Sequence, residues 1–266
     1  MFQYAFMMRA LIAGIAISLS ASLIGVNLVL SRNSLLGDGL SHVGFGSMAI
    51  ALVLNQEPLL FSMVVAMIAA FVILKFSKST NISGDSMIGI ISSSSLAIGV
   101  VATSLWGVNT DISSYMFGSI LGVNDRDVMV AVVVGVIVLM GMILLYNRIF
   151  TLTFDESFAQ AVGQKTDRFH SILAVLTAVV VVLGMRLMGA LLISGLIIFP
   201  TIIAMRIFRS FKSVMISAAI IGVINFVIGL ILSAQVNTPT GASIILVNLV
   251  ALIVFSILGT RIGNHR

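Results

Sequence analysis

The chain has 266 residues, of which 59% are hydrophobic and only 9% are charged, with a formal net charge of +5. A soluble domain carries roughly 45–50% apolar and about 25% charged residues, so this composition excludes a water-soluble globular protein and predicts a polytopic membrane protein. Cysteine is absent, which excludes disulfides and thiolate metal sites.

Nine hydrophobic runs follow one another along the chain, each close to the length of about 20 residues that spans a bilayer. They cover residues 7–30, 35–54, 59–76, 86–106, 128–146, 169–187, 190–207, 214–232 and 242–258. The connector 107–127 has room for a short interfacial or re-entrant helix, and the connector 147–167 is polar. A short or tilted first or seventh run would reduce the crossings to eight. We therefore predict an all-α membrane protein of eight to nine transmembrane helices, with residues 1–266 in one domain.

The basic residues lie between the hydrophobic runs or close to their ends, which indicates membrane topology and no nucleic-acid partner. With nine crossings, 11 of the 14 bases fall on the same side as the connector 147–167, and Arg9, Arg126 and Arg186 fall on the other side. The positive-inside rule then places this connector and the C-terminus in the cytoplasm and the N-terminus outside.

Asp38 and His42 stand four residues apart in the second run and share one helix face. Ionisable groups inside a bilayer are costly, so the pair is a candidate site at which a carboxylate and an imidazole ligate one metal ion. The alternative is a structural hydrogen bond between them. The same face continues through Gly46 and Ala49, which predicts a narrow water-filled path. Two ligands are too few for a zinc-type site, so a symmetric dimer or water would complete the coordination.

A second pattern lies in the polar connector. Thr153 and Glu156 form a T-x-x-E capping box, and Gly163 is a helix stop signal. Between them, Phe154, Phe158, Ala161 and Val162 form one apolar stripe. The pattern predicts a short amphipathic helix over about 153–163. It either rests on lipid or docks into a groove on a soluble partner.

Carboxylates on the predicted outer side are Glu57, Asp111, Asp125 and Asp127, accompanied by the loop 237–241. They would attract cations or dock a delivery protein, or they form an ordinary solvated rim. The chain has no G-x-x-x-x-G-K-[ST] motif, so ATP hydrolysis through a P-loop would require another polypeptide.

Four stretches together resemble the permease subunit of the ABC-3 family of bacterial zinc and manganese importers. They are Ser34–His42, Asp111–Gly118, Phe154–Gly163 and Met188–Pro200. The resemblance implies a permease fold of the type II importer kind in the bacterial cytoplasmic membrane. It also implies a homodimer, two cytoplasmic ATP-binding subunits and an extracytoplasmic metal-binding protein, with no permanently bound cofactor.

The resemblance also assigns roles to residues. Asp38 and His42 match the metal-ligating motif of the family. The ATPase-coupling segment matches Phe154, Asp155, Glu156, Phe158, Ala159 and Gly163. Gly39 and Val43 stand where the family commonly has alanine, which bears on metal preference.

The expected cargo is zinc, since the pattern around the loop 237–241 is more like the zinc members, with manganese or iron as the alternative. Different classes remain open from the residues alone. They are an ATP-independent channel, a secondary transporter with Asp38 as a proton-coupled site, and a membrane anchor that transports nothing.

Overall fold

The computed structural model describes residues 5–79, 82–107 and 123–263, and nearly all of them are helical. The helices, in chain order, are α1 (Ala5–Leu30), α2 (Leu35–Val53), α3 (Pro58–Ser79), α4 (Gly84–Leu105), α6 (Asp125–Leu144), α7 (Tyr146–Phe154), α8 (Glu156–Ala161), α9 (Thr166–Met188), α10 (Ala190–Ile207), α11 (Phe211–Val236) and α12 (Thr240–Gly263). Eight of them are long and apolar enough to cross a membrane. The α10 helix adds 18 further residues and contains Pro200. The predicted all-helical membrane fold is confirmed, and the region expected to hold a short helix between α4 and α6 falls mostly outside the described residues.

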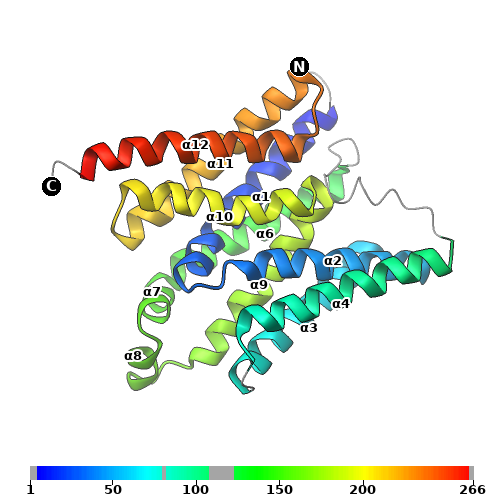
Figure 1. Ribbon diagram of the computed structural model, residues 1–266, viewed down its shortest axis with the longest axis horizontal. Coiled ribbons are helices and arrows are strands. Elements are labelled where there is room, and N and C mark those ends of the chain that lie inside the picture. Colours follow the sequence, from blue (N-terminus) through cyan, green and yellow to red (C-terminus); the bar gives the residue numbers. More distant parts are fainter. Residues whose placement is uncertain (1–4, 80–81, 108–122, 264–266) are drawn as a thin grey trace.

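The long helices run back and forth between two ends of the molecule (Figure 1). At one end, which we call the Arg186 end, Arg186 lies 3.6 Å from Glu57 and 3.4 Å from Asp127, so the α2–α3 connection, the start of α6 and the end of α9 meet. At the other end, the α8 end, the Phe154 and Phe211 rings lie 5.9 Å apart. The segments expected on opposite sides of the membrane therefore lie at opposite ends of the bundle.

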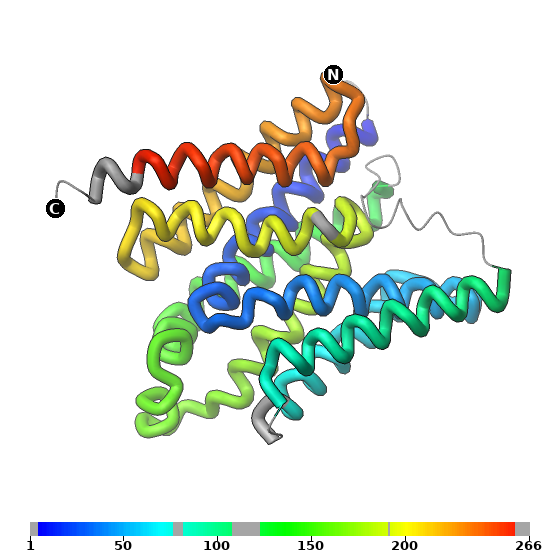
Figure 2. The backbone as a smooth tube through the Cα atoms, viewed as in Figure 1, coloured from blue at the N-terminus to red at the C-terminus, as the bar shows by residue number. Residues whose placement is uncertain are grey.

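One face of the bundle is a row of four helices, in the order α12, α10, α2 and α4 (Figures 1 and 2). The α2 and α4 helices touch through their backbones at Gly46 and Gly99. A Cβ atom added to Gly46 would lie 2.1 Å from the Ser95 carbonyl oxygen, and one added to Gly99 would lie 2.7 Å from the Gly46 Cα. Small residues allow such close approach of membrane helices. The glycines of α2 therefore serve helix packing.

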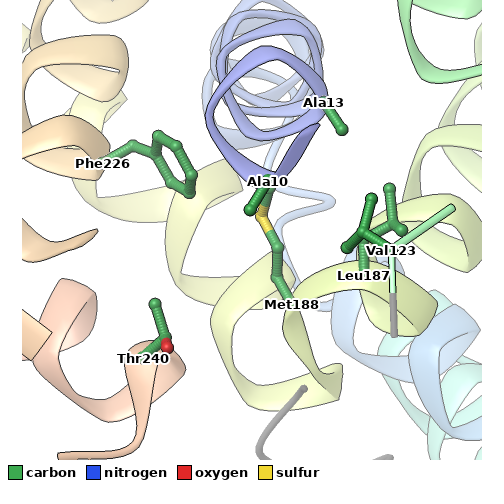
Figure 3. A pocket seen from close by; sticks show the side chains of 7 residues that line it. All are labelled: Ala10, Ala13, Val123, Leu187, Met188, Phe226 and Thr240. Atoms are coloured by element: carbon green, nitrogen blue, oxygen red, sulfur yellow. The ribbon is translucent and has the colours of Figure 1, made fainter. Parts of the chain in front are cut away.

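The interior near the Arg186 end is filled by apolar side chains around α1. The Phe226 ring of α11 lies against Gly14, where a Cβ atom would collide with it. Beside this ring is a cavity of about 10 Å³, lined by Ala10, Ala13, Val123, Leu187, Met188, Phe226 and Thr240 (Figure 3). An apolar space of this size stays dry, so it is a packing gap and does not hold a ligand.

The outer carboxylates that the structure describes are paired with arginines. Arg9 contacts Asp125 at 2.6 Å, and Arg186 lies between Glu57 and Asp127. The Asp127 side chain is only 5% exposed, and it also caps α6 in a capping box with Asn124. These carboxylates tie helix ends together, which leaves little unbalanced negative charge to attract a cation. Asp111 lies outside the described residues.

We expect Arg186→Met to lower the free energy of unfolding by about 2 kcal/mol, because it leaves the buried Asp127 carboxylate without its counter-charge. Arg9→Met is the matched control at the same end of the bundle. Its partner Asp125 is 82% exposed, so that change should amount to less than about 1 kcal/mol. Unfolding titrations of both variants in detergent would measure the difference, and equal losses would contradict the structural role of Arg186.

Candidate functional site

Asp38 and His42 lie on α2, on the fourth and eighth residues of the helix, close to the α1–α2 turn. The His42 Nε2 and Asp38 Oδ2 atoms are 3.8 Å apart. The Asp38 side chain is 47% exposed and the His42 side chain 34% exposed. At 1.5 Å per residue, His42 lies about 10 Å into the helix, somewhat nearer to its start than to its end.

The distance between the two groups bears on the alternatives left open by the sequence. A separation of 3.8 Å is too long for a hydrogen bond, so the imidazole does not satisfy the carboxylate directly. Two ligand atoms that each lie about 2.0–2.2 Å from a tetrahedral ion are themselves about 3.4 Å apart. A shift of a few tenths of an ångström would therefore bring both atoms to metal-ligand geometry.

Ser194 of α10 is a third member of the site, and we did not assign it a role from the sequence. Its Oγ donates a hydrogen bond to Asp38 Oδ1 at 3.0 Å. This contact occupies one carboxylate oxygen and leaves Oδ2 on the side of His42. Ser194 is 156 residues from Asp38 along the chain, so no local pattern could have paired them.

The other faces of α2 are covered by neighbouring helices. Added Cβ atoms would collide with α10 at Gly37, with α4 at Gly39, and would press on α9 at Gly44. Asp38 and His42 project from the face that remains partly open. Our prediction that this face continues as an open path through Gly46 is wrong within one chain, because the α4 backbone at Ser95 covers Gly46.

At this place the described part of one chain offers two candidate metal ligands, Asp38 and His42. In the part of the chain that the structure describes, no group of three or more His, Cys, Asp or Glu side chains could hold a metal ion. We call Asp38, His42 and Ser194 the candidate half-site.

The predicted helix over about 153–163 is two helices. The α7 helix ends at Phe154, and α8 begins at Glu156 after an extended backbone at Asp155. The predicted capping box is also wrong: the N-cap of α8 is Asp155, whose carboxylate accepts the hydrogen bond from the Phe158 N–H at 2.8 Å. Thr153 lies inside α7 and bonds the Ile149 carbonyl oxygen. Asp155 directly precedes α8, so its side chain reaches the free N–H groups of the first turn and caps the helix.

The stop signal was predicted correctly. Gly163 has φ +80, and its N–H donates to the Gln160 carbonyl oxygen while that of Gln164 donates to Ala159. This pair of bonds is a Schellman motif, which ends the helix through a left-handed glycine.

The α8 helix presents apolar side chains away from the bundle. Phe158 is 56% exposed and Val162 is 55% exposed, whereas Ala159 is fully buried. Two contacts hold α8 to the start of α9: His170 Nε2 lies 3.3 Å from a Glu156 oxygen, and Gln160 Nε2 lies 3.3 Å from Thr166 Oγ1. The exposed apolar patch is therefore on an anchored helix.

The Phe154 ring is 59% exposed, but it belongs to a second cluster. It packs on Phe150 of α7 at 5.0 Å and on Phe211 of α11 at 5.9 Å between ring centroids. Such ring pairs favour tilted and edge-on arrangements like these. This aromatic cluster fixes α7 against the start of α11.

The bundle of apolar helices, with an ionisable pair on one of them, is that of a polytopic helical membrane transport protein. Residues 3–259 match the ABC 3 transport family, and the chain belongs to this family. The resemblance noted from the sequence is thereby confirmed.

Relatives in the family carry different metals. The chain is 32% identical to the manganese import system permease protein ScaB of Streptococcus parasanguinis over 248 residues, which cover 93% of this chain and 89% of ScaB. It is also 32% identical to the high-affinity zinc uptake system membrane protein ZnuB of Haemophilus influenzae over 238 residues, which cover 89% and 91% of the two chains.

A solved structure agrees with the fold. The chain matches PsaBC from Streptococcus pneumoniae in complex with Fab with a TM-score of 0.85 and 29% sequence identity, covering 96% of this chain and 92% of that one. The protein is accordingly the permease of an ABC importer for metal ions and is not itself an enzyme.

Proposed function

We propose that this permease moves zinc into the cytoplasm and that Asp38 and His42 ligate the ion in transit. The observation that carries the proposal is the pair itself, with its 3.8 Å separation and its partly open position on an otherwise packed helix. Transport needs binding that is weak enough to release the ion, and an incomplete shell per chain meets that need.

A second copy of the chain completes the site. Two copies would bring two carboxylates and two imidazoles together, which is the four-ligand set that zinc takes in proteins. The α4 helix packs directly on α2, and only 17% of its apolar window is buried within one chain. Its exposed residues Gly89, Ser93 and Ala97 recur every four positions, a spacing that favours helix association in membranes. We therefore place the α2–α4 face at the dimer interface.

The α8 patch of Phe158 and Val162 docks a cytoplasmic ATP-binding subunit. Exposed aromatic and aliphatic side chains on an anchored helix are suited to a groove on a partner. The coupling segment comprises Phe154, Asp155, Glu156, Phe158, Ala159 and Gly163. The α8 end is then cytoplasmic, and the Arg186 end, with the N-terminus, faces the metal-binding delivery protein. The whole chain serves as one permease domain.

Manganese is the second candidate. ScaB, the manganese relative, is as similar to this chain as ZnuB, the zinc relative. Carboxylate and water ligands suit manganese, whereas imidazole suits zinc. The two His42 side chains of a dimer favour zinc.

Reconstituted transport would test the cargo. In proteoliposomes that contain this permease and its ATP-binding partner, we expect zinc to suppress manganese uptake at about one tenth of the concentration needed for the reverse. Radioactive zinc and manganese with unlabelled competitor would measure it. Preferential manganese uptake would replace zinc by manganese, and uptake without ATP or the partner would favour the channel or secondary-transporter class.

A further inference from the structure

The last turns of α1 and α7 are joined by a hydrogen bond between side chains 126 residues apart. The Asn27 side-chain amide donates to Thr153 Oγ1 at 2.7 Å. The Thr153 hydroxyl donates its own hydrogen to the Ile149 carbonyl oxygen, also at 2.7 Å. Asn27 is only 6% exposed, so water does not readily replace this bond. The contact is short and directional, and its Asn27 side is buried.

Thr153 stands two residues before the point where α7 gives way to α8. Its helix is held to the bundle by buried Ile149 and Leu152. Any tilt of α8 under a docked subunit would pull on this last turn of α7, because only Asp155 separates the two helices. Thr153 therefore lies where such a movement enters the bundle.

Asn27 lies where α1 turns into α2. Its carbonyl oxygen accepts a hydrogen bond from the Ser31 N–H at 2.9 Å, and the Asn33 N–H donates to Leu28 at 2.8 Å. These bonds hold the turn against the end of α1. The α2 helix begins directly afterwards, with Asp38 in its first turn. A displacement at Asn27 is thus carried by a short, bonded segment to the half-site.

We propose that Asn27 and Thr153 are positioning residues that transmit movement of the α7–α8 segment to Asp38 and His42. The proposal rests on the proposed function and adds the contact through which ATP hydrolysis in a partner reaches the metal. The ties from α8 to α9 through Gln160 and Glu156 are longer, at 3.3 Å, and neither joins α7 to the α1–α2 turn. The Asn27 contact is the better link, since it is shorter, at 2.7 Å, and joins α7 directly to the end of α1 beside the α1–α2 turn.

The test compares Thr153→Val with two controls in the reconstituted complex. Thr153→Ser keeps the hydroxyl. Thr151→Val removes a hydroxyl on the exposed side of the same helix. Like the Thr153 hydroxyl, this one donates to the carbonyl oxygen four residues earlier, here that of Asn147 at 2.9 Å. We expect Thr153→Val to lower the zinc ions imported per ATP hydrolysed about fivefold, with both controls near wild type. Zinc uptake and phosphate release, measured together, give this ratio.

A double-mutant cycle tests whether Asn27 and Thr153 act through their shared hydrogen bond. Asn27→Leu should lower the same ratio, and Asn27→Leu with Thr153→Val should be no worse than either change alone. The proposal would be overturned if the losses were additive or the ratio were unchanged. It would also be overturned if Thr153→Val failed to assemble with the ATP-binding partner while Thr151→Val assembled. A wild-type complex that imports no metal with ATP would instead overturn the proposed function, and this inference with it.

Discussion

Asp38→Asn and His42→Gln should each reduce ATP-driven metal uptake at least about a hundredfold, because each removes half of the ligands that one chain offers. Both changes nearly keep side-chain volume, and both side chains are partly exposed, so the fold should be retained. Uptake of radioactive zinc by proteoliposomes, with the copurified partner quantified on the same sample, measures the effect.

Ser194→Ala provides a graded comparison at the same site. It removes the hydrogen bond to Asp38 Oδ1 but no proposed ligand, so the apparent KM for metal should rise about fivefold with little loss of maximal rate. Normal uptake by both Asp38→Asn and His42→Gln would refute the ligand assignment. A loss with Ser194→Ala as large as theirs would mean that the whole α2–α10 contact, and not ligation, limits transport.

Phe158→Asp should abolish copurification of the permease with its ATP-binding subunit. The ring is 56% exposed, so a carboxylate there is tolerated by the isolated chain but is costly in an apolar groove on a partner. A pull-down from detergent-solubilised membranes, followed by ATPase activity of the eluate, measures the loss.

The matched control is Phe158→Leu, which keeps an apolar side chain at the same position and should retain most of the binding. Copurification of Phe158→Asp at the wild-type level would contradict the docking role of α8 and favour an interfacial helix that rests on lipid. Loss of binding by both variants together with lower thermal stability would instead indicate a packing role for the ring.

Most of the transmembrane architecture could be predicted from hydrophobic run lengths. The predicted run 190–207 matches α10, and the run 35–54 differs from α2 by one residue. Apolar runs between short polar turns are a local signal, so the sequence is sufficient. The missed α7 helix is short and amphipathic in a connector that reads as polar, and its buried positions, Ile149 and Leu152, find their packing partners only in the folded bundle.

The candidate site was predicted only in part, for a physical reason. Asp38 and His42 are four residues apart and can be paired by helix geometry alone. The contacts to Ser194 and between Asn27 and Thr153 join residues more than 100 positions apart, and neighbouring side chains do not encode them. The prediction of an open path through Gly46 was wrong because a glycine in the sequence is equally consistent with open space and with close contact to a neighbouring backbone.

The close packing of α2 restricts how Asp38 and His42 can move. Glycines 37 and 44 meet α10 and α9 on one side of the helix, and glycines 39 and 46 meet α4 on the opposite side. Rotation of α2 about its own axis by even one residue, about 100°, would drive a side chain into the Ser95 backbone. This packing therefore holds α2 against rotation, and Asp38 and His42 cannot swing away from their present positions by a turn about the helix axis. Under the proposed function, Asp38 and His42 therefore leave the ion only when α2 is displaced as a whole.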